Sequence, residues 1–225
     1  MGAKHVSHLV GWTVGCAVAP IVLRSMFGRG WGVIGVGCAL LATAWVLIVL
    51  PRSAHRNFER ARFKSAARSY RLIGAFSFTA SRERAALLSR AGCAIASGQP
   101  AAAEATLAAI DPATLDVAER VVWLNNRACV ALDGGKDPAD ALLLVEEAVG
   151  LRPDLPAIQH TRARALLAIG RVDEAITVLE AMRSGGELSV HLEFERCRDL
   201  ALAWEHKGQV DYAADYRERA RMHAT

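Results

Sequence analysis

Two long apolar runs open the sequence. They cover residues 6–23 and 31–50, and neither contains Asp, Glu, Lys or Arg. The second run has about the twenty residues that a helix needs to cross roughly 30 Å of hydrocarbon, so we predict a transmembrane helix there. The first run is shorter and carries Pro20 near its end. We predict a second span for it, with a signal peptide cleaved after Ala19 or a helix lying in the membrane interface as alternatives.

Basic residues gather beside these runs. Residues 1–83 hold eleven basic and two acidic side chains, whereas residues 84–225 hold sixteen basic and twenty-one acidic ones. The positive charge therefore points to anionic lipid rather than to nucleic acid, and we expect no nucleic-acid partner. Five basic residues after the second run are expected to contact lipid headgroups: Arg52, Arg56, Arg60, Arg62 and Lys64. Because short basic segments stay on the cytoplasmic side, we expect a multi-pass protein of a bacterial inner membrane with its C-terminal domain in the cytoplasm.

Beyond residue 80 the apolar positions follow a helical period and are interrupted by short turns. Four segments superimpose on one template, which places eight small residues at matching positions: Ala91, Cys129, Ala163 and Ala201 in the first helices, and Ala103, Ala141, Ala175 and Ala213 in the second helices. Successive second-helix positions are 38, 34 and 38 residues apart. This pattern predicts four helix pairs, in the repeats 84–115, 122–153, 156–187 and 194–225.

The spacing resembles the tetratricopeptide repeat family, whose period is about 34 residues. Gly98, Gly170 and Gly208 stand at the turn within a repeat, where a helix end favours glycine. The resemblance implies a right-handed α-solenoid of about four helix pairs. Together with the transmembrane helical hairpin that the two apolar runs predict, it gives an all-α fold. The order of two spans and then repeats is similar to that of the HemY family of membrane proteins. That second resemblance is architectural and carries no catalytic residue.

The segment 52–80 has two interpretations. Its sequence RFKSAARSYRLIGAF is similar to a second repeat helix, with Ala66 at the small position and Tyr70 at the bulky one. That half-repeat would dock the membrane-proximal helix onto the array. The alternative is a simple basic juxtamembrane helix.

Catalytic signatures are missing from the sequence. The five cysteines, Cys16, Cys38, Cys93, Cys129 and Cys197, show no CxxC spacing, and the seven histidines form no HExxH motif. The chain also lacks a glycine-rich phosphate-binding loop. We therefore predict a protein that is not an enzyme, with no catalytic residue, no metal site and no cofactor.

Binding is the better expectation, because stacked helix pairs present an extended groove lined by their first helices. Carrying over the groove positions of the repeat family residue by residue gives a candidate partner-binding set: Trp123, Asn126, Val130, His160, Arg164, Arg198 and Leu202. The arginines suit bidentate contact with a carboxylate. We predict a membrane-anchored scaffold or adaptor that binds a protein or peptide on the cytoplasmic face. The alternative is a structural or assembly subunit of a membrane complex, whose transmembrane helices make the main contacts.

Overall fold

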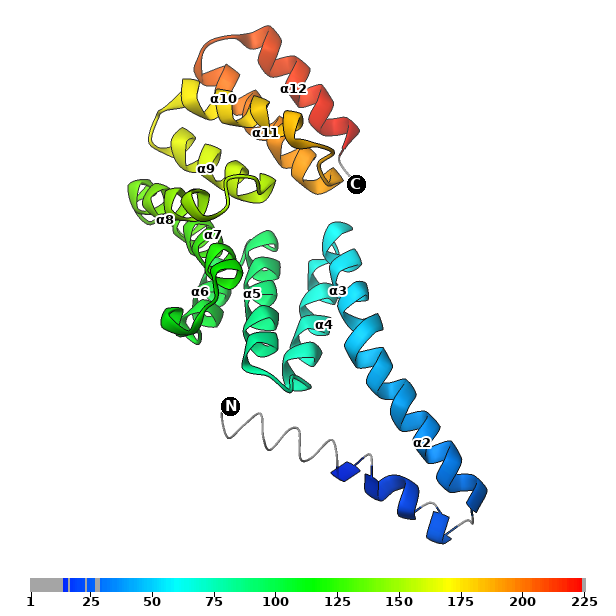
Figure 1. Cartoon of the computed structure of the whole chain (residues 1–225). Coiled ribbons are helices and arrows are strands. Elements are labelled where there is room, and N and C mark those ends of the chain that lie inside the picture. Colours follow the sequence, from blue (N-terminus) through cyan, green and yellow to red (C-terminus); the bar gives the residue numbers. More distant parts are fainter. Residues whose placement is uncertain (1–13, 16, 23, 27–28, 224–225) are drawn as a thin grey trace.

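The computed structural model describes residues 14–15, 17–22, 24–26 and 29–223, and within these ranges the regular elements are helices (Figure 1). The N-terminal part comprises α2 (Arg29–Ala44), the π-helix η1 (Trp45–Val49), α3 (Leu50–Glu59) and α4 (Phe63–Ala75). Four further helix pairs follow: α5 (Ala80–Ala96) with α6 (Pro100–Ala108), α7 (Val117–Asp133) with α8 (Pro138–Leu151), α9 (Pro156–Ala168) with α10 (Val172–Ala181), and α11 (Val190–His206) with α12 (Val210–Met222). Short 3₁₀ helices, η2 (Pro112–Thr114) and η3 (Met182–Gly185), lie in two of the connections.

One long helix is formed by α2, η1 and α3 without interruption. Its part Val33–Glu59 is long and apolar enough to cross a membrane, by length and composition, and it contains most of the second predicted span. The first predicted span, 6–23, lies mostly outside the described residues. A shorter apolar helix, Ala17–Met26, overlaps its end. The described residues therefore contain one apolar helix of spanning length, and the predicted hairpin is not shown.

The π-helix has a local cause. Pro51 lacks an N–H group, and its ring crowds the carbonyl four residues earlier, which is that of Leu47. The helix widens into η1 over the turn that contains this carbonyl. Arg82 at the start of α5 donates to this carbonyl, with its Nη2 3.1 Å from the oxygen of Leu47. This hydrogen bond ties the repeat array to the long apolar helix.

A helix pair precedes the four predicted repeats. Ala54 in α3 and Ala66 in α4 are both fully buried, and they are twelve residues apart, as are the paired small residues of the four repeats. Ala61, seven residues after Ala54, has a φ of 54° and stands where three of the four other turns have a glycine. The α3–α4 pair packs against α5 through an apolar cluster that includes Ile73 and Ala86. The stack of pairs therefore begins within the long helix itself.

Small residues hold each of the four repeat pairs together. Seven of the eight predicted positions have 3% exposure or less, and Cys129 has 8%. A larger side chain at such a position would push the two helices apart. The apolar clusters lie within pairs and between neighbouring pairs, so that each repeat is stabilised mainly by its neighbours.

The two 38-residue steps between successive second helices arise from longer first helices as well as from longer turns. Helices α7 and α11 are 17 residues long, whereas α9 is 13 residues long. The extra N-terminal turns begin at good capping residues: Asp116 forms a capping box with Glu119, and the Ser189 hydroxyl accepts the N–H of Leu192. The first helices of these repeats consequently start earlier than the predicted boundaries at 122 and 194.

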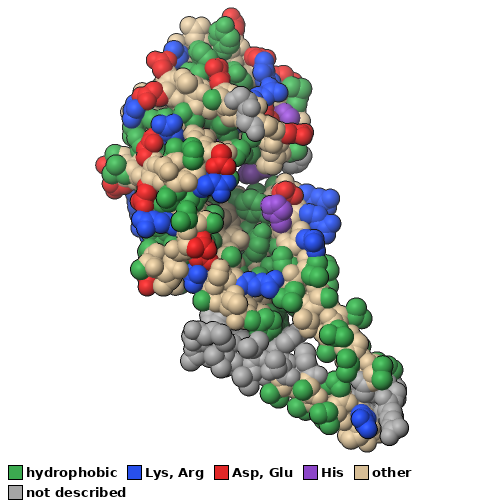
Figure 2. All heavy atoms as spheres, in the orientation of Figure 1, with side chains coloured by type: hydrophobic (Ala, Val, Ile, Leu, Met, Phe, Trp, Pro, Cys, Tyr) green, Lys and Arg blue, Asp and Glu red, His purple; other side chains and the backbone are tan. Residues whose placement is uncertain are grey.

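The two ends of the array meet. The ring of Phe63, at the start of α4, lies 5.5 Å from the ring of His191, at the start of α11, and 5.3 Å from that of Phe58. Figure 1 shows the turn between α3 and α4 near the C-terminal repeat, and Figure 2 shows a recess between these parts of the molecule. The inner side of the array is therefore partly closed by an aromatic contact.

Candidate interaction surface

Polar contacts join the first helices of successive pairs. Between α5 and α7, Glu119 accepts hydrogen bonds from the Ser81 hydroxyl and from Arg84 Nε, each at 2.8 Å. In the same interface Asn126 Nδ2 donates to the carbonyl of Leu88 at 3.0 Å. Glu119 and Asn126 are both buried. These side chains fix the stacking of repeats and are not available to a partner.

The next interface, between α7 and α9, repeats the arrangement. Arg164 Nη2 lies 2.5 Å from Asp133 Oδ1, and the side chains of Cys129 and Thr161 are 3.4 Å apart. The Arg164 guanidinium is about one-quarter exposed. Part of this predicted groove residue therefore faces solvent, while its charge is compensated within the array.

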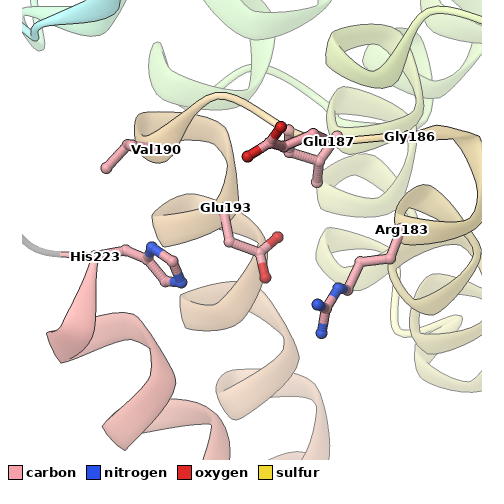
Figure 3. A pocket seen from close by; sticks show the side chains of 7 residues that line it. Arg183, Gly186, Glu187, Val190, Glu193 and His223 are labelled. Carbon is pink, nitrogen blue, oxygen red and sulfur yellow. The ribbon is translucent and has the colours of Figure 1, made fainter.

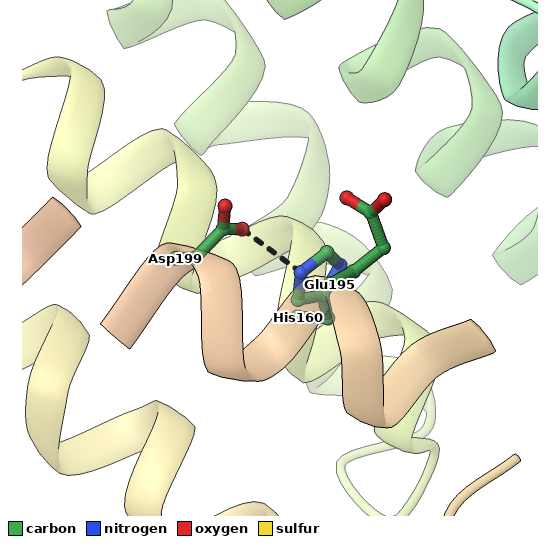
Figure 4. A group of neighbouring side chains, drawn as sticks. All are labelled: His160, Glu195 and Asp199. Carbon is green, nitrogen blue, oxygen red and sulfur yellow. Dashed lines mark ion pairs between the residues drawn. The ribbon is translucent and has the colours of Figure 1, made fainter. Parts of the chain in front are cut away.

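A buried charged cluster joins α9 to α11 (Figure 4). His160 Nε2 lies 2.9 Å from Asp199 Oδ2, with about a tenth or less of either side chain exposed. Arg198 contacts both Asp199 and Glu195. Burial by itself raises the pKa of Asp199, but the hydrogen bond from His160 and the charges of His160, Arg198 and Arg164 outweigh it and hold the pKa below its usual value. The cluster is a network of charged and polar contacts between α9 and α11.

The same cluster contains the residues that could hold a metal ion. Potential ligand atoms of His160, Glu195 and Asp199 lie within 4.8 Å of one another. Arg198, however, already forms ion pairs with both Glu195 and Asp199, and a divalent cation would have to compete with its guanidinium. Charge compensation by arginine accounts for the cluster, so we assign it a structural role between repeats.

The structure divides the seven predicted groove residues into separate environments. Asn126, Val130 and His160 are buried between helices. Trp123 is half-buried between two apolar clusters, with the Arg127 guanidinium 5.4 Å from its ring centroid. Sequence reasoning placed these side chains on an open face because it could not identify the carbonyl of Leu88 or the carboxylate of Asp199 as their partners.

The remaining two predicted residues line a surface pocket. Arg198 and Leu202 of α11 face residues of α12 across a pocket of about 230 Å³. Its lining comprises Arg198, Ala201, Leu202, Arg217, Ala220 and Arg221. Leu202 is 47% exposed. An apolar floor with three guanidinium groups suits an apolar side chain next to a carboxylate, and we name these six residues the α11–α12 pocket.

A second surface pocket of about 410 Å³ lies where η3, the start of α11 and the end of α12 meet. Figure 3 shows Glu193 between Arg183 and His223, with Glu187 nearby. Glu193 is already paired with Arg196 at 2.7 Å. The mixture of charges gives this pocket no preference for one sign of ligand.

The predicted headgroup-binding residues are all exposed. Arg52 and Arg56 lie on α3, and Arg60, Arg62 and Lys64 lie at or beside the turn between α3 and α4. This turn is the end of the pair that lies farther from the apolar run.

The cysteines of the array are buried thiols. Burial raises the pKa of Cys93 to about 11 and also raises the pKa of Cys129 and Cys197. Each thiol therefore holds less of the nucleophilic thiolate at neutral pH than an exposed cysteine. Cys129 occupies a packing position, in agreement with its small size.

One comparison with known proteins, the match to a family model, supports the repeat interpretation. Residues 134–184, which contain α8, α9 and α10, match the tetratricopeptide repeat family. A crystal structure of nearly identical TPR-like repeats, assigned to a kinesin light chain of Podosopora anserina, is similar at 24% identity, with 79% of this chain and 94% of that chain covered and a TM-score of 0.49. The comparison with curated proteins gives no match. The chain thus contains a segment that matches the tetratricopeptide repeat family, within an array of stacked helix pairs.

Proposed function

We propose that this protein is a membrane-anchored scaffold that binds a protein partner through its repeat array. The observation that carries the proposal is the direct joining of two parts: an apolar helix of spanning length continues into α3, and α3 is the first helix of the stack. Tetratricopeptide repeats are typical of protein–protein interaction, and the proposed role is non-catalytic. The array would thereby be held at a fixed position relative to the membrane.

The proposal places the array in the cytoplasm of a bacterial cell, at the inner membrane. Its support is the excess of Lys and Arg after the apolar run, which favours the cytoplasmic side. A reporter fused to the C-terminus tests the orientation. Activity of a reporter that functions only in the cytoplasm is expected, and activity of one that functions only outside would contradict it.

The α11–α12 pocket is the proposed binding surface. It combines an exposed leucine with arginines at its rim, whereas the buried groove positions are occupied by contacts between repeats. Arg217 and Arg198 have acidic neighbours, at Glu205 and Glu195 respectively, so the pocket would exchange these pairs for a partner carboxylate. The expected ligand is a peptide segment with an apolar side chain beside an acidic one.

Crosslinking in native membranes, followed by purification of the full chain and quantitative mass spectrometry, tests this surface. Leu202→Ala removes the apolar floor, and Leu143→Ala on α8 is the matched control, because Leu143 is 72% exposed and lies outside the pocket. We expect Leu202→Ala to reduce specific crosslinked partners at least fivefold and Leu143→Ala to leave them unchanged. Equal recovery from both variants would contradict the assignment.

A second candidate is an assembly subunit that makes its main contacts through the membrane helix. Gly35, Gly37 and Ala39 favour it, because small residues allow close approach between membrane helices. Exchange of the apolar run 31–50 for an unrelated span distinguishes the two. Loss of partners on exchange, with no effect of Leu202→Ala, would favour the assembly subunit.

A further inference from the structure

We propose that the connection between α4 and α5, residues 76–79, lies in the lipid headgroup layer and forms a second membrane contact beside the apolar helix. The inference rests on the proposed membrane anchoring. It differs from the predicted contact through the basic side chains of the α3–α4 turn, Arg60, Arg62 and Lys64, because it assigns the lipid-facing role to the opposite end of the α3–α4 pair.

The position of the connection follows from contacts on both sides of it. Ile73, near the end of α4, packs in one apolar cluster with Leu50, the last residue of the apolar run. Arg82, in the first turn of α5, reaches the carbonyl of Leu47. Residues 76–79 lie between these two anchor points in the sequence, so they lie level with the final turns of the apolar run. Figure 1 shows the α4–α5 connection at the end of the array that faces α2.

The chemistry of this end suits the membrane interface. Phe76 and Leu72 are 40% and 42% exposed. Arg71 beside them is also exposed. Phenylalanine and leucine side chains of interfacial segments enter the boundary between headgroups and acyl chains, and long basic side chains reach from there toward lipid phosphates. An exposed phenylalanine and leucine next to an arginine therefore match the boundary at which the apolar run ends.

The turn between α3 and α4 is much farther from that boundary. Lys64 and Phe76 are twelve residues apart on or beside α4, which at 1.5 Å per residue separates them by about 18 Å along the helix axis. Electrostatic attraction to a charged surface falls off over about 8 Å at physiological ionic strength. Arg62 and Lys64 consequently contribute little to lipid binding, whereas Arg52, two residues after Leu50, stays close to the headgroups.

Site-specific photocrosslinking to lipid tests the inference on the full chain. A benzophenone amino acid replaces Phe76, Lys64 or Leu41 in separate variants, and Leu41 serves as the marker of the span because it is 72% exposed on α2. Each variant is reconstituted into vesicles of phosphatidylcholine and phosphatidylglycerol, irradiated, and analysed for lipid adducts by intact-protein mass spectrometry. Protection of the buried Cys93 from maleimide shows that each variant is folded.

We expect lipid adducts at positions 41 and 76, with a yield at 76 at least fivefold above that at 64. Adducts at 41 together with a yield at 76 no higher than at 64 would overturn the second contact and leave the proposed anchoring intact. Absence of adducts at 41 would overturn the anchoring and, with it, this inference.

Discussion

Arg82 donates a hydrogen bond to the carbonyl of Leu47, which lies four residues before Pro51, a residue with no N–H group to donate. The contact spans 35 residues and connects the first turn of α5 to the π-helix of the apolar segment. A sequence feature that disrupts one helix is thus compensated by a side chain of the next repeat. This relationship fixes the array relative to the proposed membrane span.

A double-mutant cycle tests this compensation. Arg82→Ala should lower the free energy of unfolding by about 1 kcal/mol, because it removes the hydrogen bond to the carbonyl of Leu47. Pro51→Ala restores an N–H donor within the helix, so Arg82→Ala should have little further effect in that background. Urea unfolding of the full chain in mild detergent, followed by far-UV circular dichroism, measures all four forms. Equal effects of Arg82→Ala in both backgrounds would show that the two residues are not coupled.

The His160–Asp199 contact predicts a defined pH dependence. The pKa of Asp199 is lower in the folded chain than the unfolded value of about 3.9, so its contribution to stability is present above that pH and is lost as the pH falls through the folded pKa. Asp199→Asn should lower stability by about 2 kcal/mol at pH 6. The difference from the parent protein should shrink toward pH 3.

The matched control is Asp215→Asn, which alters an exposed pair with Arg219. It should change stability little at any pH, because solvent screens exposed ion pairs. A difference between Asp199→Asn and the parent that stays constant from pH 6 to pH 3 would contradict the assigned role of the carboxylate.

Replacement of Ala61 by glycine should increase the stability of the folded chain. Its φ of 54° is unfavourable for a residue with a Cβ, whereas Gly170 at the matching turn has a φ of 81°. Ala61→Gly should stabilise the chain by about 0.5 kcal/mol and Gly170→Ala should destabilise it by about 1 kcal/mol. Thermal unfolding measures both, with Ala105→Gly in the middle of α6 as a control that should be destabilising. Destabilisation by Ala61→Gly would show that the turn does not have this backbone conformation.

The small positions should reject larger side chains. Ala103 is fully buried against α5, while Ala105 in the same helix is exposed. Ala103→Leu should cost about 2 kcal/mol or more because it overpacks the helix pair. Ala105→Leu should be nearly neutral. Similar unfolding midpoints for the two variants would argue against close packing at the repeat template's small position.

Much of the repeat array could be predicted from sequence because its determinants are local. Small residues must recur where two helices touch, and the predicted turn glycines Gly98, Gly170 and Gly208 all have positive φ. The sequence predicts only the second helix of the α3–α4 pair as part of a repeat. Ala61 stands in place of the turn glycine, and α3 is fused to an apolar run. The twelve-residue interval from Ala54 to Ala66 was the signal that could have revealed it.

The binding surface was harder to predict because burial depends on partners distant in sequence. Asn126 and His160 have polar side chains at groove positions, yet their contacts with Leu88 and Asp199 come from repeats 38 and 39 residues away. No local pattern distinguishes such a side chain from one that faces solvent. Leu202 lines the α11–α12 pocket together with Ala201 and Ala220. It is exposed, and it is the apolar residue of the proposed binding surface.

Alkaline carbonate extraction of cell membranes containing the full chain tests the proposed membrane anchoring most directly. Carbonate releases peripheral proteins but leaves proteins that span the bilayer in the membrane pellet. The apolar helix Val33–Glu59 predicts that the full chain stays in the pellet, and that a variant with Leu40 and Leu41 both replaced by Arg moves toward the supernatant, because charge at the bilayer centre is costly. Release of the unmodified chain into the supernatant would contradict the anchored scaffold.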